Sequence, residues 1–189
     1  MNVKRCSWAN YSELEIDYHD NEWGVPVHDD IIHFEYLILE GAQAGLSWHT
    51  ILQKRDNYRK AFKEFDPVKV SGFKDKQIQA LLNNPGIVRN RLKINSAVTN
   101  ANCFLEIQAK HGSFDTFIWN YVDGKPIVNK WKSIDQVPAT TSLSETISKD
   151  LKKSGLKFVG PTIIYSYLQA TGLINDHLTS CFRFKELKK

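Results

Sequence analysis

Long hydrophobic runs are absent from this chain of 189 residues, although 42% of its residues are hydrophobic. A membrane-spanning helix needs about 20 consecutive apolar residues, and no stretch of the sequence approaches that length. Two cations near the start, Lys4 and Arg5, are not followed by the apolar core of a signal peptide. The sequence therefore predicts a cytoplasmic protein with no membrane partner.

Cysteine and glycine are also scarce, with 3 and 10 residues, which excludes a disulfide scaffold and a collagen-like repeat. Cys6, Cys103 and Cys181 cannot all pair with one another. Free or metal-bound thiols in a reducing compartment are therefore favoured over disulfide bonds. The remaining composition is globular, and it predicts a single domain over residues 1–189.

Charge is unevenly distributed, although the net charge is only +4. Residues 1–50 carry an excess of acidic side chains and residues 51–100 an excess of basic ones. Concentrated basic charge suits a polyanion such as nucleic acid. The alternative, which composition alone favours, is that the basic residues between 54 and 63 merely solvate one helix face.

Helix signals dominate the sequence, and the fold class they predict is all-α. Capping residues, apolar spacing and breakers favour helices over 29–44, from Ser47 to the Asp66–Pro67 step, and over 75–83, 91–110, 142–155 and 161–172. Residues 125–131 favour a short extended segment. No repeat or linker divides the chain into two domains.

The last two of these helices are separated by a short turn, Leu156–Gly160. Its glycine permits close approach of another backbone. Free amides at the start of the second helix, with its dipole and Lys152, Lys153 and Lys157 nearby, form a phosphate site that reads no base sequence. The alternative is an ordinary helical hairpin packed on itself.

Potential metal ligands lie at both ends of the chain: Cys6 and His19, then His177 and Cys181. The second pair has i, i+4 spacing, which places both side chains on one face if that segment is helical. Two thiolates and two imidazoles suit a closed tetrahedral zinc site that contributes to folding. The alternative is ordinary packing, because the sequence has no Cys-x-x-Cys pair.

A third cluster combines aromatic side chains with one carboxylate. Trp8, Tyr18, Trp23 and Trp48 surround Glu40 in the sequence, and Glu40 ends an otherwise apolar segment. A buried carboxylate needs a partner, and aromatic faces around it suit a flat cation that donates hydrogen bonds. The alternative is that the tryptophans are core and Glu40 caps or pairs locally.

Several runs of the sequence are characteristic of a known family; they are residues 18–24, 39–48, 65–70, 156–162 and 175–177, followed by Cys181. In order and spacing they resemble bacterial DNA-3-methyladenine glycosylase I. The resemblance implies a helix-hairpin-helix DNA glycosylase fold with a zinc site joining the termini. It also implies a monofunctional, monomeric hydrolase that flips 3-methyladenine out of alkylated double-stranded DNA and cleaves its N-glycosidic bond.

The same resemblance assigns roles to individual residues. It implies that one structural Zn²⁺ per chain is bound by Cys6, His19, His177 and Cys181. It makes Glu40 the catalytic carboxylate of a base pocket formed by Tyr18, Trp48, Trp8 and Trp23. It also implies that the duplex is contacted by Leu46, as a wedge, and by Gly160 and Lys157.

Departures from related enzymes limit the expected chemistry. Thr162 stands where bifunctional relatives carry a Schiff-base lysine, so we expect no strand cleavage. Asn175 stands where many relatives have an aspartate that supports the oxocarbenium ion, with Asp176 shifted by one position. Because a neutral amide cannot supply that charge, we expect excision of labile cationic lesions only. Phe158 replaces the usual first glycine of the hairpin.

Two other functions remain compatible with the sequence. One is a non-catalytic helix-hairpin-helix module that binds DNA, with Glu40 as part of the core. The other is a glycosylase that prefers different N3- or N7-methylated purines.

Overall fold

The computed structural model describes residues 3–188, and most of them are helical. The helices are α1 (Glu13–Asn21), α2 (Asp30–Gln43), α3 (Trp48–Ala61), α4 (Pro67–Ser71), α5 (Asp75–Leu82), α6 (Arg91–His111), α7 (Phe114–Trp119), α8 (Ser142–Lys153), α9 (Pro161–Ala170) and α10 (Phe182–Glu186). Short 3-10 turns cover Ser7–Asn10, Lys63–Phe65, Asn120–Val122 and Ile134–Gln136. Within residues 3–188, no helix is both long and apolar enough to cross a membrane.

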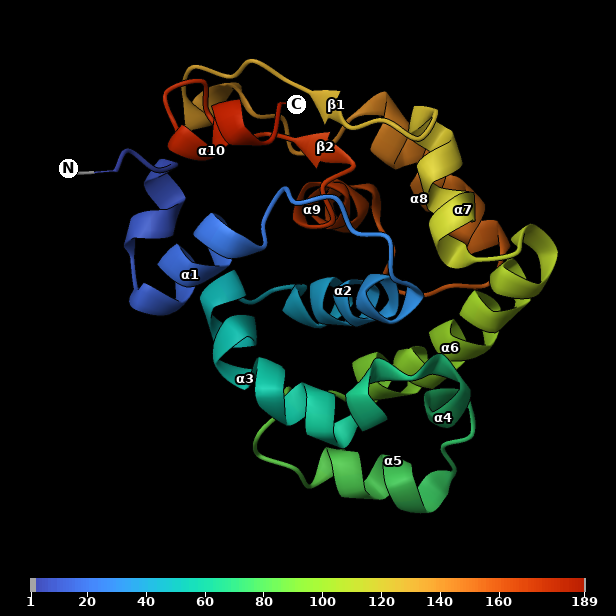
Figure 1. Cartoon of the computed structure of the whole chain (residues 1–189). Helices are drawn as coiled ribbons and strands as arrows, with labels where there is room; N and C mark the ends of the chain where they lie inside the picture. The colour runs from blue at the N-terminus through green and yellow to red at the C-terminus, as the bar shows by residue number, and fades with distance from the viewer. Residues whose placement is uncertain (1–2, 189) are drawn as a thin grey trace.

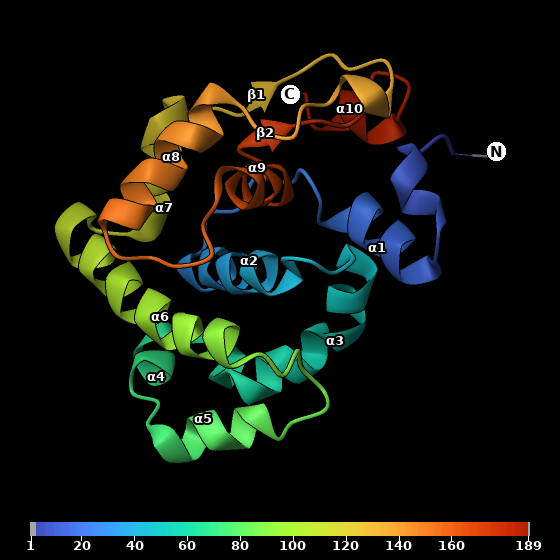
Figure 2. The same ribbon diagram turned by 180° about the vertical axis from the view of Figure 1, so that it is seen from behind.

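Helix α2 runs through the centre of the molecule (Figures 1 and 2). Every residue from His33 to Ala42 is buried, and the helix predicted over 29–44 is confirmed. Helix α9 lies along one side of α2, and α3, α4, α5 and α6 lie on the other. Helices α1 and α10 close one end, and α7 and α8 close the opposite end.

The helix starts follow local capping chemistry. The Asp29 carboxylate accepts hydrogen bonds from the amides of Ile31 and Ile32 at 2.8 and 3.1 Å, and the Ser47 hydroxyl accepts one from Thr50 at 3.2 Å. Both predicted starts are confirmed. The predicted capping box at 142–145 is wrong by one position, because Thr141 and Ser144 bond reciprocally instead.

The helix that begins after Ser47 ends earlier than predicted, at Ala61. Lys63, Glu64 and Phe65 follow it with φ of 57°, 56° and 54°, a left-handed turn that L-residues rarely adopt. Complete burial of the Phe65 ring offsets that cost. The Asp66–Pro67 step does not end a helix; Asp66 instead caps α4.

The expected extended segment contains a strand, β1 (Ile127–Val128), which pairs in parallel with β2 (Ile174–Asn175). The sequence did not predict β2, because two residues are too few for a periodic signal. The pairing places the loop after β1 beside the segment that follows β2. That loop closes one side of the candidate site.

Some basic side chains of residues 51–100 form ion pairs with acidic side chains of residues 1–50 inside the protein. Arg55 is buried and forms ion pairs with Glu22 and Glu35 at 2.6 and 2.5 Å. The interpretation of the 54–63 segment as purely solvated is therefore wrong for Arg55. On the same helix, Lys60 is exposed and Lys54 is half-buried.

Gly172, which follows α9, is required by both conformation and space. It has φ +72°, and a Cβ there would lie 2.4 Å from the backbone of Val25 and Pro26. We therefore expect Gly172→Ala to lower the free energy of unfolding by about 3 kcal/mol or more, measured by urea unfolding. Gly112→Ala is the control, since φ is +87° there but no atom lies within 4 Å; it should cost about 1 kcal/mol. Equal losses would contradict the steric argument.

Candidate functional site

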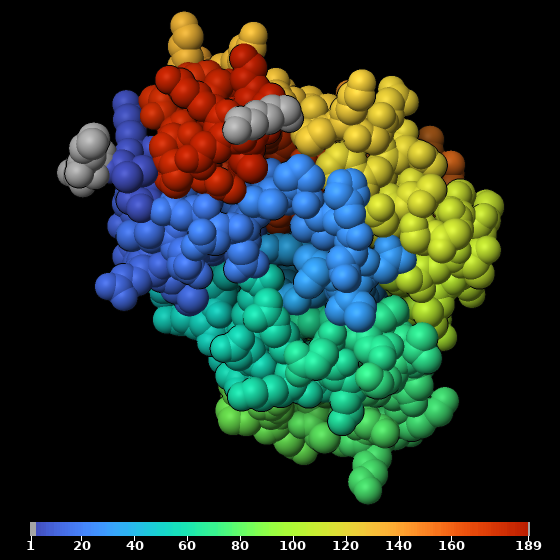
Figure 3. Space-filling model, viewed as in Figure 1, coloured from blue at the N-terminus to red at the C-terminus, as the bar shows by residue number. Residues whose placement is uncertain are grey.

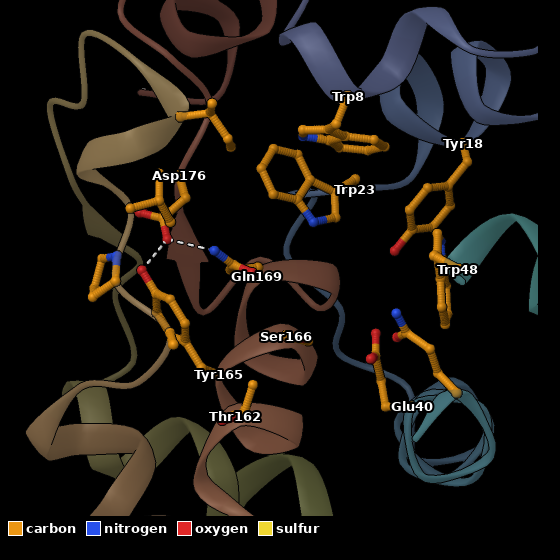
Figure 4. Close-up of a pocket in the computed structure, with 15 residues that line it drawn as sticks. Trp8, Tyr18, Trp23, Glu40, Trp48, Thr162, Tyr165, Ser166, Gln169 and Asp176 are labelled. Atoms are coloured by element: carbon orange, nitrogen blue, oxygen red, sulfur yellow. Dashed lines mark hydrogen bonds between the residues drawn. The ribbon is translucent and has the colours of Figure 1, made fainter. Parts of the chain in front are cut away.

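A cavity of about 280 Å³ lies between α2 and α9. One of its walls is aromatic and another is the polar side of α9, with Glu40 between them (Figure 4). Its lining residues are Trp8, Tyr18, Trp23, Glu40, Gln43, Trp48, Ile134, Val137, Pro138, Ala139, Thr162, Tyr165, Ser166, Gln169 and Asp176. The five residues predicted for a pocket thus do lie together.

The aromatic wall is assembled from three separate segments. Trp8 and Trp23 meet edge to face with ring centroids 5.0 Å apart, and Tyr18 lies 5.3 Å from Trp48. Trp48 is the first residue of α3, so the Ser47 cap fixes its position. Its indole Nε1 is buried and has no acceptor among the described residues. The wall therefore retains a hydrogen-bond donor that the fold itself does not satisfy.

Glu40 lies on α2 with only 4% of its surface exposed. Its carboxyl group has no hydrogen-bond or ion-pair partner within residues 3–188, so burial alone raises its pKa to about 8. Its carboxyl group and the Tyr18 hydroxyl point into the same space (Figure 4). Burial also raises the pKa of Tyr18 well above its usual value, which keeps that hydroxyl neutral. Glu40 neither caps a helix nor forms a local pair.

The polar wall was not identified from the sequence. Thr162, Tyr165, Ser166 and Gln169 line the cavity from α9. Their spacing of three and four residues marks one helix face, and this polar stripe in an otherwise apolar helix is the signal that could have revealed them.

Asp176 lines the cavity, whereas Asn175 does not. The Asp176 carboxylate accepts hydrogen bonds from Tyr165, from Gln169 at 2.7 Å, and from Asn129 and Trp131, both at 2.7 Å. A carboxylate is therefore present in the wall, one position later than in the relatives with an aspartate. Four donors hold it in place.

Two turns meet beside the cavity. Leu46, in the turn Ala44–Leu46 (the 44–46 turn), is 42% exposed, and Gly45 there has φ +79°. A second hollow of about 190 Å³ extends from Glu40 along this turn to Thr162 and Ile163 at the start of α9. The 44–46 turn and α9 therefore share one continuous surface with the base of the cavity.

The turn Leu156–Gly160 (the 156–160 turn) joins α8 to α9. Phe158 has φ +54°, so it adopts the left-handed conformation that a glycine would adopt most easily. Lys157 is exposed, and a Cβ on Gly160 would meet no atom within 4 Å. No described residue accepts the amides of Thr162 and Ile163, whereas Asp29 and Ser47 accept the free amides at the starts of α2 and α3.

The predicted metal ligands converge into one buried cluster. One ligand atom from each of Cys6, His19, His177 and Cys181 lies within 4.8 Å of the others. The segments containing them lie side by side (Figure 3), and the Phe182 amide donates to the Lys4 carbonyl at 3.0 Å. His177 and Cys181 meet through a turn and not a helix, since α10 begins only after Cys181. This arrangement could hold a metal ion.

The outer contacts of this cluster orient both histidines. His19 Nδ1 bonds to the Asp20 carboxylate at 2.8 Å, and His177 Nε2 donates to the Trp23 carbonyl at 3.0 Å. Each imidazole therefore directs a lone pair toward the sulfur atoms. The Cys6 thiol and the two imidazoles lower the pKa of Cys181 far below its usual range. Two sulfur atoms and two imidazole nitrogens in this arrangement form a donor set that fits a cation.

Comparison with known proteins assigns the chain to a family. The family model described as methyladenine glycosylase matches residues 8–184. This chain belongs to the methyladenine glycosylase family. The resemblance drawn from the sequence is thereby confirmed, and so is the mostly helical fold.

Individual methyladenine glycosylases are similar along nearly their whole length. DNA-3-methyladenine glycosylase 1 of Escherichia coli is 46% identical over 179 residues, which cover 95% of this chain and 96% of that protein. A crystal structure of 3-methyladenine DNA glycosylase I has a TM-score of 0.92 and 47% identity, covering 95% of this chain and 98% of that one. A tyrosine-to-phenylalanine variant of such an enzyme, solved in complex with 3-methyladenine, has a TM-score of 0.91 and 37% identity, covering 94% and 96%.

Proposed function

We propose that this chain is a monofunctional DNA-3-methyladenine glycosylase, a hydrolase that excises 3-methyladenine from alkylated double-stranded DNA. The observation that carries the proposal is Glu40, a buried carboxyl group without a partner that faces an aromatic wall. Family membership supports the same reaction. The enzyme acts as a monomer of one domain, residues 1–189, in the cytoplasm.

The chemistry requires few groups. Methylation at N3 makes adenine cationic, so the glycosidic bond is already weakened and the base leaves as a neutral molecule without a strong acid. Glu40 accepts hydrogen bonds from the amino edge of the base and favours its positive charge over neutral adenine. Tyr18 supplies a neutral hydroxyl to the same space, while Trp8 and Trp23 form the outer wall. Selectivity follows from charge and hydrogen-bond pattern together.

Extraction of the base uses the two turns. Flipping a nucleotide costs a few kcal/mol of unstacking, which stacking on Trp48, worth about 1–3 kcal/mol, offsets. Leu46 fills the gap left in the duplex. Free amides after Gly160 and the ammonium of Lys157 bind phosphate in the manner of a helix-hairpin-helix motif.

The same residues limit the reaction. Thr162 lines the cavity but has no amine, so no Schiff base forms and the strand remains intact. Asp176 supplies the wall's carboxylate, but four donors disperse its charge. It therefore stabilises an oxocarbenium ion weakly, and the enzyme is restricted to labile cationic bases.

The metal that suits the buried cluster is Zn²⁺, in a structural role. Bonds of about 2.3 Å to sulfur and about 2.0 Å to nitrogen imply tetrahedral edges of about 3.5 Å. The sulfur–nitrogen distances between Cys181 and the two histidines are 3.5 and 3.6 Å, and Cys6 lies 3.7 Å from His177. Protein atoms would fill all four positions of a tetrahedral ion at this cluster, so no position would remain for water, and the ion would join the two ends of the chain.

The decisive experiment is chromatography of the bases released from DNA treated with a methylating agent. We expect release of 3-methyladenine, little 7-methylguanine, no hypoxanthine from a deaminated substrate and no strand breakage. Trp48→Ala should lower excision about tenfold to hundredfold because stacking is lost, while Trp48→Phe should retain most of it. If the folded wild type binds DNA but releases no base, the binding-module alternative is correct. Release mainly of another methylated purine would establish the altered-specificity alternative.

A further inference from the structure

Lys93, on the long helix α6, reaches across to the end of α2. Its Nζ atom donates hydrogen bonds to the carbonyls of Ala42 at 2.8 Å and Ala44 at 2.6 Å. The last carbonyls of a helix lack partners within the helix and carry partial negative charge, so an ammonium there stabilises the helix end. Ala44 begins the 44–46 turn. Lys93 thus fixes the base of the turn that carries Leu46.

Asn100, on the same helix, holds the other turn. Its Nδ2 atom donates to the Lys157 carbonyl at 2.9 Å, and its Oδ1 atom accepts from the Lys157 amide at 2.7 Å. The side chain is only 2% exposed. Both backbone groups of Lys157 are therefore bound by one buried amide, although the Lys157 side chain itself is exposed.

These two contacts come from one face of one helix. Lys93 and Asn100 are seven residues apart, which is about two helical turns and about 10 Å along the axis. Helix α2 also packs directly against the 156–160 turn, since a Cβ on Gly41 would lie only 3.2 Å from the Cβ of Phe158. Helix α6 therefore holds the two turns at a fixed distance from each other.

We propose that Lys93 and Asn100 are positioning residues that keep the 44–46 and 156–160 turns in register, so that Leu46 and the hairpin engage one duplex simultaneously. The proposal rests on the proposed function, which assigns both turns to DNA. Neither residue touches the base. Misplacement of a reacting group by about 1 Å can cost about a hundredfold in rate, and here the misplaced groups are the wedge and the phosphate site.

The experiment compares Lys93→Met and Asn100→Ala with two matched controls. Lys54→Met removes a lysine that also donates to a backbone carbonyl, that of Pro85 at 3.1 Å. Asn102→Ala removes an exposed amide from α6 that bonds only to Val98. The measurements are kcat/KM on duplex DNA, binding of free 3-methyladenine by tryptophan fluorescence, the salt dependence of DNA binding, and the fluorescence of 2-aminopurine beside the lesion.

We expect both test variants to lose about tenfold or more in kcat/KM on duplex DNA and to give a smaller 2-aminopurine signal, because flipping is impaired. Binding of the free base should be unchanged, since the pocket is intact, and the controls should match the wild type. Lys93→Arg should restore part of the activity. Each lysine that contacts a phosphate adds about 0.9 to the slope of the logarithm of the DNA-binding constant against the logarithm of the salt concentration. A decrease of that size in Lys93→Met would show that Lys93 contacts phosphate itself, and this would overturn the positioning role.

Wild-type rates in both test variants would also refute the proposal while leaving the proposed function intact. If the proposed function itself were wrong, the wild type would release no 3-methyladenine, and this result distinguishes the two failures.

Discussion

Glu40→Gln should abolish most excision of 3-methyladenine while making the free protein more stable at neutral pH. The pKa of Glu40 is raised to about 8 by burial, against an ordinary value of 4.5. Between these values the folded protein retains a proton that the unfolded chain releases, so wild-type stability falls as the pH rises through this window. A glutamine has no such penalty. The gain should reach a few kcal/mol at pH 8 and vanish near pH 4.5.

Urea unfolding of the two free proteins at several pH values between 5 and 8 measures this difference. Glu106→Gln, at an exposed position, is the matched control and should shift stability equally at every pH. If the free energies of unfolding of wild type and Glu40→Gln differ by the same amount at every pH, the conclusion that the Glu40 carboxyl group is buried without a partner is wrong.

The loss of activity has the same physical origin. The positive charge of the bound base favours the ionised form of Glu40, and the carboxylate in turn stabilises the cationic base. Replacing this carboxylate by an amide should lower kcat/KM by about a hundredfold or more. Excision of the cationic base from DNA by the wild type should rise about tenfold per pH unit as the pH approaches 8 from below, since Glu40 must first lose its proton. Initial rates of 3-methyladenine release from methylated duplex DNA at several pH values test this dependence.

Removal of the proposed Zn²⁺ should destabilise the protein by several kcal/mol. The ligands come from both ends of the chain, and His19 and His177 are completely buried. Without a cation, two sulfur atoms and two imidazole lone pairs face one another with no shared partner. We expect the purified, reduced protein to contain about one zinc per chain, and a chelator or Cys181→Ser to lower its melting temperature sharply.

The matched control is Cys103→Ser, because Cys103 is only partly buried and lies outside the cluster. It should retain its zinc and its melting temperature. A folded wild-type protein with far less than one zinc per chain and an unchanged melting temperature would refute the structural role.

Those parts of the fold that depend on adjacent residues could be predicted from the sequence. Asp29, Ser47 and Pro161 begin helices as expected because capping depends only on nearby side chains. Glu40 could be identified as a candidate site residue because a charged side chain in an apolar, buried segment is unusual, whatever the segment packs against.

The errors have tertiary causes. Helix α3 ends before a left-handed turn, whose energetic cost is offset by the burial of Phe65 only in the folded protein. The spacing of His177 and Cys181 would place them on one face only of a helical segment, and their segment is a turn between β2 and α10. Arg55 was expected on the surface, but Glu35, twenty residues earlier, accepts its hydrogen bond in the interior.

A metal ion bound by the cluster would make the chain a ring between Cys6 and Cys181. Cross-linking a loop of this length destabilises the unfolded state by about 5 kcal/mol in simple chain models, so the proposed ion would act as a reversible cross-link. Chain ends usually fray first, but this ion would tie the two terminal segments to each other. Trp8 and Trp23 each follow a cluster ligand within a few residues, so the same ion would also hold the aromatic wall of the cavity in place.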